Sequence, residues 1–506
     1  MPRLFLVPLV IWLGGCSLFL YDSASFGIAG ADKSGISASV MPHPDALYAN
    51  DRVRVTLSNK DHFTIFYSTN AGSDPTNAGS QYMGPLDFDK VAPFTLYARV
   101  TNSEGIWGDR LVFPVTAIAD GSAAHPWQIA NERHLSNVRF NMAAGRHFLQ
   151  TADIAIVSNK PWTPIGTGGP QFSALYDGGG RRITGLVITN CGTVCGLFGA
   201  ANMATFRNIR IEGADITASD NNVAILCGAA ITTQFSDCII DGGSVRNMNT
   251  GSIHTGSLAG LITTGCLVLR CTASGVNVSG GDFVGGLVGN ATGGGGFREC
   301  TVDPQGISGR ACVGGLVVGA SSGAGSINFT NCSISGSGAE PISGNSHVGG
   351  LIGYYSSGGG FLSECAINIA SAVTGTNNVG GLVGNLFGDN IQNCRAIVSV
   401  TGVSNVGGLA GYNGGIIFSS LVGPDAGGQY IAGTNFVGGM VGWNKGQINT
   451  SGVLGKVSVN GFMHVGGIAG ICVDVGQINA SFAQCPVTCA GSFGGGADGS
   501  VNDAAF

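Results

Sequence analysis

The chain has 506 residues, of which 10% are charged and 87 are glycine, and its formal net charge is −6. A hydrophobic content of 44% excludes a disordered chain. The sequence has no basic cluster after Arg181-Arg182, which argues against a nucleic-acid partner. The length predicts two or more domains, unless one of them is an elongated repeat.

Residues 1–15 are predicted to be a signal peptide. Arg3 precedes the apolar segment LFLVPLVIWL, which is too short to cross a bilayer as a helix. The segment ends in LGGC, which resembles the lipobox of bacterial lipoproteins. The resemblance implies that Cys16 receives lipid and holds the protein on a membrane; the alternative is an ordinary signal peptide with a chance cysteine. Ser17, in place of an aspartate, favours the outer membrane, so we expect a lipid-anchored protein at the bacterial outer membrane or cell surface.

A linker over residues 16–40 precedes a β-domain expected over residues 41–118. RVRVTLS places Val53, Val55 and Leu57 on one face, and FTIFYST and FTLYARVT alternate in the same way. These segments predict short strands with one buried face.

The stretch IFYSTNAGSDPTNAGSQY, within this domain, resembles the signature of the chitobiase C-terminal-like domain. That resemblance implies an immunoglobulin-like β-sandwich of the kind found as an accessory in surface and carbohydrate-active proteins. Asn70-Ala71 departs from the Asp-Gly of the family pattern. We interpret Asp74 and Pro75 as turn formers, with a binding role for the loop as the alternative.

A glycine-rich motif of the type VGGLVG recurs about every 30 residues, which is typical of a stacked repeat. Its ten copies begin at residues 194, 223, 255, 284, 313, 348, 379, 406, 437 and 465. The segments are β-branched and lack helix-capping boxes, so they favour a parallel β-helix with one coil per copy over a helical repeat. We expect each glycine pair, for example Gly349 and Gly350, to turn a corner of the coil, with at least one requiring a positive φ or a close backbone approach.

Cysteines also recur in this region, at one position in each of six copies of the repeat. Six of them each follow a repeat motif at a similar distance: Cys238, Cys271, Cys300, Cys332, Cys365 and Cys394. The residue before each is polar or charged, and the residue two positions after each is apolar, which predicts that the cysteines point inward as a small apolar column. This column lacks the clustered ligands and neighbouring histidines of a metal site.

The repeated motif resembles the GLUG repeat of bacterial surface proteins, some of which are immunoglobulin A peptidases, over about residues 125–490. PWTPIG, YDGGGRRITGLVI and CGLFG strengthen the resemblance. We therefore expect an N-terminal cap and first coils over residues 119–193, a right-handed parallel β-helix over residues 194–492 and a frayed coil or tail over residues 493–506. The segment NERHLSNVR, from Asn131, is expected to form a short capping helix.

Catalytic chemistry has few candidates in the sequence. The peptidases of that family carry a zinc-binding H-E-x-x-H helix, but this chain has no His-Glu pair. Polysaccharide-degrading β-helix enzymes need clustered carboxylates or basic residues, and the candidates here, Asp237, Glu299 and Glu364, are spread over different coils. We interpret these three as members of a solvated polar column.

Two cysteine pairs, Cys191 with Cys195 and Cys485 with Cys489, are candidate disulfides in an exported protein, with plain core residues as the alternative. No catalytic residue, metal site or cofactor is expected. The sequence thus predicts an all-β, non-catalytic surface lipoprotein, in which an immunoglobulin-like β-sandwich is followed by a right-handed parallel β-helix. Expected partners are the membrane, through the lipid, and a glycan or a host or matrix protein; the alternative function is a polysaccharide lyase or glycoside hydrolase.

Overall fold

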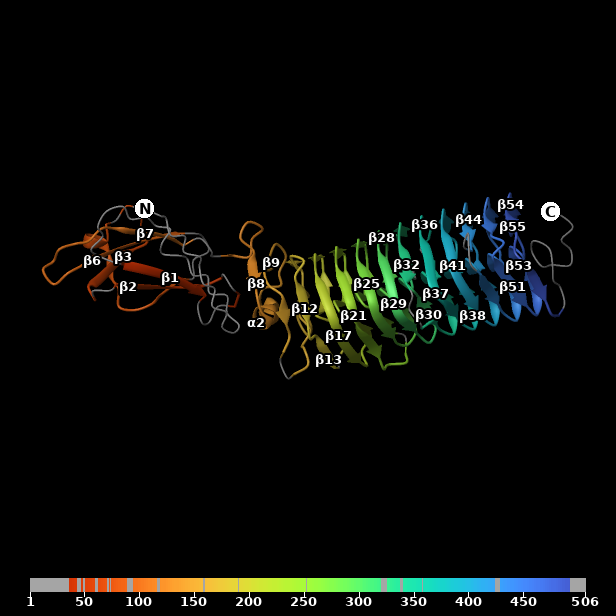
Figure 1. Cartoon of the computed structure of the whole chain (residues 1–506), viewed down its shortest axis with the longest axis horizontal. Helices are drawn as coiled ribbons and strands as arrows, with labels where there is room; N and C mark the ends of the chain where they lie inside the picture. The colour runs from red at the N-terminus through yellow and green to blue at the C-terminus, as the bar shows by residue number, and fades with distance from the viewer. Residues whose placement is uncertain are drawn as a thin grey trace, which may run out of the picture. The chain divides into compact units, whose positions relative to one another are not determined.

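The structure is a computed structural model, which describes residues 36–42, 47–48, 51–59, 62–70, 72, 74–88, 94–115, 119–157, 160–189, 191–251, 253–319, 325–336, 340–356, 358–423 and 428–491. These residues form an all-β chain that divides into two compact units, residues 1–128 and 129–506 (Figure 1). Cys16, the expected signal peptide and the expected tail over residues 493–506 lie outside the described residues.

The first unit contains two small antiparallel sheets with a shared apolar core. One sheet has the order β1-β2-β5, and the other has the order β4-β3-β6-β7. The strands are β1 (Ile36–Pro42), β2 (Val53–Asn59), β3 (Thr64–Ser68), β4 (Ser80–Gln81), β5 (Leu86–Phe88), β6 (Phe94–Thr101) and β7 (Leu111–Val115). Val53, Val55 and Leu57 are at most 3% exposed, which confirms their predicted inward face. The two sheets agree with the expected sandwich in its coarse features.

The loop between β3 and β4 contains one helical turn, α1 (Pro75–Ala78). The Asp74 carboxylate accepts a hydrogen bond from the backbone N–H of Thr76 at 3.2 Å, and Pro75 occupies the first turn. Proline suits this position because its missing N–H would have no partner within the helix. Asp74 and Pro75 therefore shape the loop, as expected, by starting a helix.

The second unit is a parallel β-solenoid, in which strands of successive coils lie side by side (Figure 1). Its start is covered by α2 (Glu132–Asn137), which is followed by the 3₁₀ helix η1 (Val138–Phe140). Asn131 caps α2 by accepting a hydrogen bond from the backbone N–H of His134 at 3.0 Å. Leu135 and Val138 are fully buried, so the helix expected from the sequence is present with these side chains turned inward.

Four sides of the solenoid are formed by sheets that run along its axis. The 17-stranded sheet contains β10 (Ile154–Ala155), β12 (Arg182–Thr184), β13 (Val187–Thr189), β17 (Arg210–Ala218), β21 (Ile239–Asn247), β25 (Thr272–Ser279), β29 (Thr301–Ser308), β32 (Ser333–Gly336), β33 (Ile342–Ser343), β37 (Ala366–Thr374), β41 (Arg395–Thr401), β45 (Leu421–Val422), β46 (Gln429–Ala432), β50 (Gly452–Val453), β51 (Val457–Gly461), β55 (Phe482–Ala483) and β56 (Val487–Cys489). The 13-stranded sheet contains β8 (Trp127–Ile129), β9 (His147–Gln150), β11 (Leu175–Asp177), β16 (Thr205–Arg207), β20 (Gln234–Ser236), β24 (Cys266–Leu269), β28 (Gly295–Arg298), β31 (Ile327–Thr330), β36 (Phe361–Ser363), β40 (Asn390–Gln392), β44 (Ile416–Phe418), β49 (Gln447–Asn449) and β54 (Gln477–Asn479).

The repeat motif itself builds the other two sides. Its first half forms the 10-stranded sheet, with β14 (Val194–Cys195), β18 (Asn222–Val223), β22 (His254–Thr255), β26 (Phe283–Gly285), β30 (Cys312–Gly314), β34 (Ser346–Gly349), β38 (Asn377–Gly380), β42 (Ser404–Gly407), β47 (Asn435–Gly438) and β52 (Met463–Gly466). Its second half forms a 4-stranded sheet of β15 (Phe198–Asn202), β19 (Cys227–Ile231), β23 (Ala259–Thr263) and β27 (Val288–Thr292), and a 5-stranded sheet of β35 (Ile352–Tyr355), β39 (Val383–Leu386), β43 (Ala410–Asn413), β48 (Val441–Asn444) and β53 (Ala469–Cys472).

Equivalent residues of the repeat stack on one another, because the strands pair in register. The first valine of each motif, here called position 0, lies beside its copies in the adjacent coils, as in the series Val313, Val348 and Val379. The first copy differs from the prediction by one residue, since Cys195 rather than Val194 pairs with Val223. The first coil is therefore one residue shorter at this point than its alignment with VGGLVG suggests.

The glycine pair lies at a bend between two sheets, but neither residue has a positive φ. A Cβ on Gly349, in β34, would overlap the carbonyl oxygen of Ile352 and lie 2.6 Å from the amide nitrogen of Gly384 in the next coil. A Cβ on Gly350 would overlap the carbonyl oxygen of Gly381. The pair is thus required by close backbone approach, which is one of the two reasons expected from the sequence.

Left-handed backbone occurs elsewhere in the coil, in two columns of residues that are mostly not glycine. One column immediately precedes position 0 and contains His347, Asn378, Asn405, Phe436 and His464, each with φ between 50° and 55°. The other immediately precedes the cysteine column and contains Asp237, Arg270, Glu299, Asn331, Glu364 and Asn393, each with φ between 50° and 56°. The second column turns the chain between strands, whereas the first lies within strands of the 10-stranded sheet, as His347 does in β34. This conformation costs a non-glycine residue roughly 1 kcal/mol.

Candidate functional site

The column of six cysteines is buried, as predicted, but it also makes hydrogen bonds that an apolar column would not make. The Sγ of Cys365 lies 3.2 Å from the carbonyl oxygen of Ser363 and accepts the backbone N–H of Cys332, in the preceding coil, at 3.3 Å. The Sγ of Cys394 accepts the backbone N–H of Cys365 in the same way at 3.4 Å. The thiols therefore satisfy backbone groups beside a left-handed corner.

Serines continue this column after the last cysteine. Ser420 Oγ accepts the backbone N–H of Cys394 at 3.2 Å, and Ser451 Oγ accepts the backbone N–H of Ser420 at 3.1 Å. Ser420 and Ser451 are fully buried. Cysteine and serine both suit this position because each has one small side-chain atom that can both donate and accept. The column is thus structural, and a search for cysteine alone misses its serines.

The candidate carboxylates Asp237, Glu299 and Glu364 occupy the left-handed positions described above, in separate coils. Asp237 is engaged by the guanidinium of Arg270 in the next coil, at 2.7 and 2.9 Å. Hydrogen bonding to Arg270 lowers the pKa of Asp237 below its ordinary value. A general acid needs the opposite shift, so this carboxylate is poorly suited to protonate a leaving group near neutral pH.

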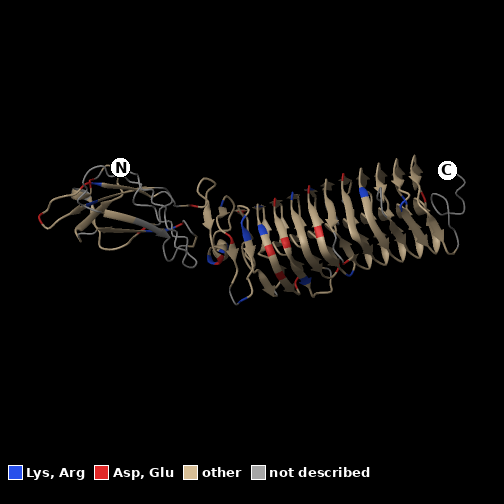
Figure 2. Cartoon of the chain, viewed as in Figure 1, with Lys and Arg blue, Asp and Glu red and all other residues tan. Residues whose placement is uncertain are grey.

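Other carboxylates and arginines form an ion-pair column on the outer face of the 17-stranded sheet. Arg182 lies 3.0 Å from Asp153 and 3.7 Å from Glu212, and Arg210 lies 2.5 Å from Glu212 and 2.7 Å from Asp241. Figure 2 shows acidic and basic residues together on the strands of these first coils. Each of the two arginines thus contacts two carboxylates, and these contacts join the first coils to one another.

The two candidate disulfide pairs differ in the structure. Cys191 and Cys195 are joined by a disulfide, with their Cα atoms 5.4 Å apart. Cys485 and Cys489 are not joined to each other. The Sγ of Cys485 lies 3.7 Å from the carbonyl oxygen of Gly467, and the Sγ of Cys489 lies 3.4 Å from the carbonyl oxygen of Phe462. The second pair is therefore corrected to two thiols that face different backbone groups.

Asp220 adjoins the disulfide, and together with Cys191 and Cys195 it is the only group with metal-ligand spacing found among the described residues. Its carboxylate accepts the backbone N–H of Cys191 at 2.8 Å. A disulfide offers no thiolate, and thiolates are the form of cysteine that binds metal. With the disulfide formed, the carboxylate therefore orients the Cys191 turn and the group offers no metal site.

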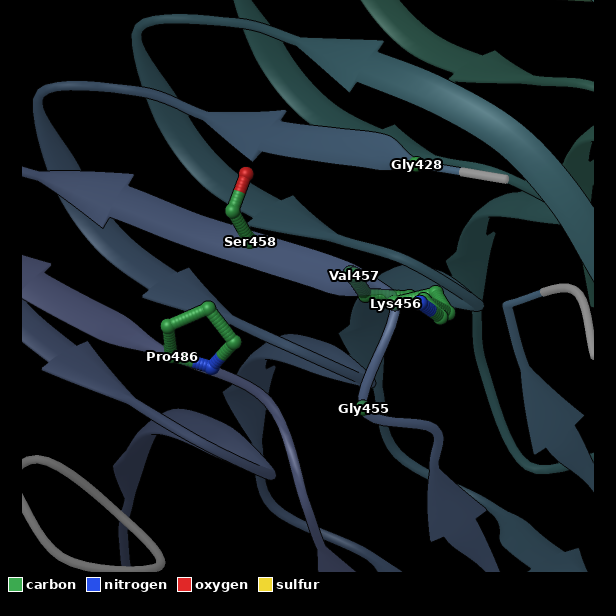
Figure 3. A pocket seen from close by; sticks show the side chains of 6 residues that line it. All are labelled: Gly428, Gly455, Lys456, Val457, Ser458 and Pro486. Carbon is green, nitrogen blue, oxygen red and sulfur yellow. The ribbon is translucent and has the colours of Figure 1, made fainter. Parts of the chain in front are cut away.

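A surface cavity of about 380 Å³ lies beside the start of β51 (Figure 3). Its lining residues are Gly428, Gly455, Lys456, Val457, Ser458 and Pro486. Lys456 is the one ionisable side chain in this lining, so the cavity contains no pair of groups for acid and base catalysis.

A stripe of aromatic and amide side chains runs along the edge where the 10-stranded and 5-stranded sheets meet. We define this aromatic–amide stripe as two rows of residues. The first row directly precedes position 0 in five coils and contains His347, Asn378, Asn405, Phe436 and His464. The second row consists of Tyr354 and the residues paired with it in register in the following coils, which are Asn385, Tyr412, Trp443 and Ile471. All are partly exposed except Asn385, which is 9% exposed.

The two rows of the stripe are in contact. The rings of His347 and Tyr354 are 5.4 Å apart, and those of Phe436 and Trp443 are 4.9 Å apart, both edge to face. The stripe positions are not among the residues that the copies share, so the shared motif does not predict the stripe. The signal was present as a variable position before the first valine of each copy, which is occupied by His, Asn or Phe in most copies.

No helix in the described part of the chain is long and apolar enough to cross a membrane. No family model matches the sequence. A protein of Evansella cellulosilytica named "Putative Gly-rich membrane protein" is 32% identical over 160 residues, which are 30% of this chain and 18% of that protein. The chain therefore matches less than a fifth of the length of this relative.

Solved structures that are similar to this chain have low sequence identity to it. A "putative immunoglobulin A1 protease from Bacteroides ovatus" has 19% identity and a TM-score of 0.40, over 50% of this chain and 80% of that chain. A family 28 exopolygalacturonase of Yersinia enterocolitica has 9% identity and a TM-score of 0.24, over 90% of this chain and 99% of that chain. At these values neither structure carries an argument about the activity of this chain.

Proposed function

We propose that this protein is a non-catalytic lipoprotein of the bacterial outer membrane or cell surface, anchored through Cys16. In this proposal the first unit is an immunoglobulin-like domain of the chitobiase C-terminal type, and the second is a right-handed β-solenoid of GLUG repeats. The solenoid presents a surface for binding or adhesion to a glycan or to a host or matrix protein, or displays the chain structurally.

The observation that carries this proposal is the use of the charged residues. Asp153, Glu212, Asp241 and Asp237 each face an arginine of an adjacent coil. Backbone and side-chain hydrogen bonds from Arg182 lower the pKa of Asp153, just as Arg270 lowers that of Asp237. Carboxylates held ionised in ion pairs stabilise stacked coils and keep the surface soluble, whereas hydrolysis of a glycosidic bond requires one carboxyl group that stays protonated.

The anchoring part of the proposal is tested by cell fractionation of the full-length protein and its Cys16→Ala variant. Because the thiol of Cys16 is the expected acceptor of lipid, the variant should lose its recovery in the membrane fraction, while Cys485→Ala, as a control, should not. Equal membrane recovery of Cys16→Ala and wild type would contradict lipid anchoring.

The non-catalytic part is tested separately, by incubating the full-length protein with neutral and acidic polysaccharides and measuring new reducing ends and unsaturated products. We expect no product above that of a heat-denatured sample. Product formation that is lost in Asp237→Asn or Glu299→Gln would instead support a polysaccharide-degrading enzyme.

A further inference from the structure

The aromatic–amide stripe has side-chain groups that the fold does not use. Within the described part of the chain, the hydroxyl groups of Tyr354 and Tyr412 and the indole N–H of Trp443 make no hydrogen bond. The carboxamide oxygen of Asn385, between the two tyrosines in register, also has no hydrogen-bond partner. The two tyrosine hydroxyl groups and the indole N–H, at partly exposed positions, are therefore available to a ligand.

The stripe also contains no acidic residue, lysine or arginine. None of its ten residues is Asp, Glu, Lys or Arg, and burial lowers the pKa of His347, which favours its neutral form. Lys445, adjacent to Asn444 in β48, is paired with Asp474 at 3.0 Å. The stripe has no row of cations that would attract a polyanion, so its lack of charged side chains favours an uncharged partner.

The spacing of the rings follows the axis of the solenoid. Adjacent coils are about 4.8 Å apart, so Tyr354 and Tyr412, two coils apart, are separated by roughly 10 Å along the axis, which is about the length of a disaccharide. The ring of Trp443 lies in the coil after Tyr412. Aromatic rings present flat apolar faces, which match the C–H faces of hexopyranose rings, and amides and phenols provide hydrogen bonds to sugar hydroxyls.

Contacts within the stripe hold these rings before any ligand arrives. Phe436 stacks on His464 with ring centroids 4.9 Å apart and an interplanar angle of 18°, and Phe436 also contacts Trp443 edge to face. The amide of Asn405 donates to Asn378 at 2.7 Å. Side chains that are already ordered lose less conformational entropy on binding.

We propose that the aromatic–amide stripe binds an uncharged polysaccharide, with the sugar chain running along the axis of the solenoid. Tyr354, Tyr412 and Trp443 stack against sugar rings, and the hydroxyl groups of the two tyrosines hydrogen-bond to sugar hydroxyl groups. This inference rests on the proposed binding function and narrows its ligand to a neutral glycan.

The test is a binding titration of the full-length protein against three soluble neutral polysaccharides, mannan, dextran and a mixed-linkage β-glucan, with polygalacturonate as the acidic comparison. Tyr412→Ala and Trp443→Ala each remove one ring. Tyr430→Ala is the matched control, because Tyr430 is 47% exposed on a different side, in β46 of the 17-stranded sheet. Melting temperatures of all variants are recorded, and Trp443→Phe keeps an aromatic ring in case Trp443→Ala is poorly folded.

We expect wild type and Tyr430→Ala to bind at least one neutral polysaccharide equally well, and each of Tyr412→Ala and Trp443→Ala to bind it roughly five- to tenfold more weakly. Trp443→Phe should retain most of the affinity, and quenching of Trp443 fluorescence should accompany binding in the wild type. Equal affinity of the stripe variants and wild type would overturn the stripe as the site while leaving the proposed binding function standing. Binding to polygalacturonate alone would overturn the neutral-glycan ligand, and absence of binding to all three neutral probes would overturn the inference as a whole.

Discussion

Replacing Gly349 by alanine should destabilise the solenoid strongly, because the added methyl group has no space between two backbones. Its Cβ would lie 2.6 Å from the amide nitrogen of Gly384, whereas ordinary contact begins at 3.4 Å, so β34 and β39 would have to separate by about 0.8 Å. No side-chain rotation can relieve an overlap with backbone atoms. A separation of this size strains the hydrogen bonds from Gly350 to Gly380 and from Leu351 to Leu382, and we expect a loss of about 3 kcal/mol.

The assay is thermal unfolding of the full chain by circular dichroism, together with limited proteolysis. Gly349→Ala should lower the Tm of the solenoid by roughly 4 °C, because the entropy of unfolding grows with the length of the unit. New cleavage should appear between residues 320 and 390, because coils in a linear stack depend on their neighbours. Gly169→Ala is the matched control, since a Cβ on Gly169 would have no atom within 4 Å. If Gly349→Ala melts with the control and shows no new cleavage, close backbone approach is not the reason for this glycine.

Further predictions concern the buried cysteine column and the buried histidines. Cys365→Ser should change the free energy of unfolding by no more than about 1 kcal/mol, because serine can still accept the N–H of Cys332. Cys365→Ala should lower it by about 1–3 kcal/mol, because that N–H is left unpaired. Equal unfolding free energies for the two variants would show that the hydrogen bond is irrelevant. Burial lowers the pKa of His254 to about 4, below that of an exposed imidazole. The unfolded chain therefore binds the proton more tightly than the folded chain does. The free energy of unfolding should fall by up to about 3 kcal/mol as the pH drops from about 6.5 to about 4. The slope of Tm against pH in that range should be shallower in His254→Gln than in wild type, and identical slopes would contradict a buried neutral imidazole.

The sequence by itself determined the features that repeat with each coil. A period of about 30 residues with β-branched and glycine-rich segments specifies a stacked β-fold, because every copy must make the same contacts with its neighbours. The same periodicity places the cysteine column inside, and the alternation of Val53, Val55 and Leu57 defines the buried face of β2. These properties depend on neighbours at a constant separation in the chain, which a pattern in the sequence can reveal.

Only the tertiary structure decided how the strands within one coil approach one another. Gly349 meets Gly384 because the 10-stranded and 5-stranded sheets come together backbone to backbone, and the left-handed turn falls on His347 rather than on the glycines. Likewise, Cys191 reaches Cys195 while Cys485 and Cys489 face different carbonyl groups, although both pairs have the same spacing in the chain. Tyr354 and His347 lie on different strands and form one surface only after the coil closes, and for this physical reason the aromatic–amide stripe is a property of the folded solenoid.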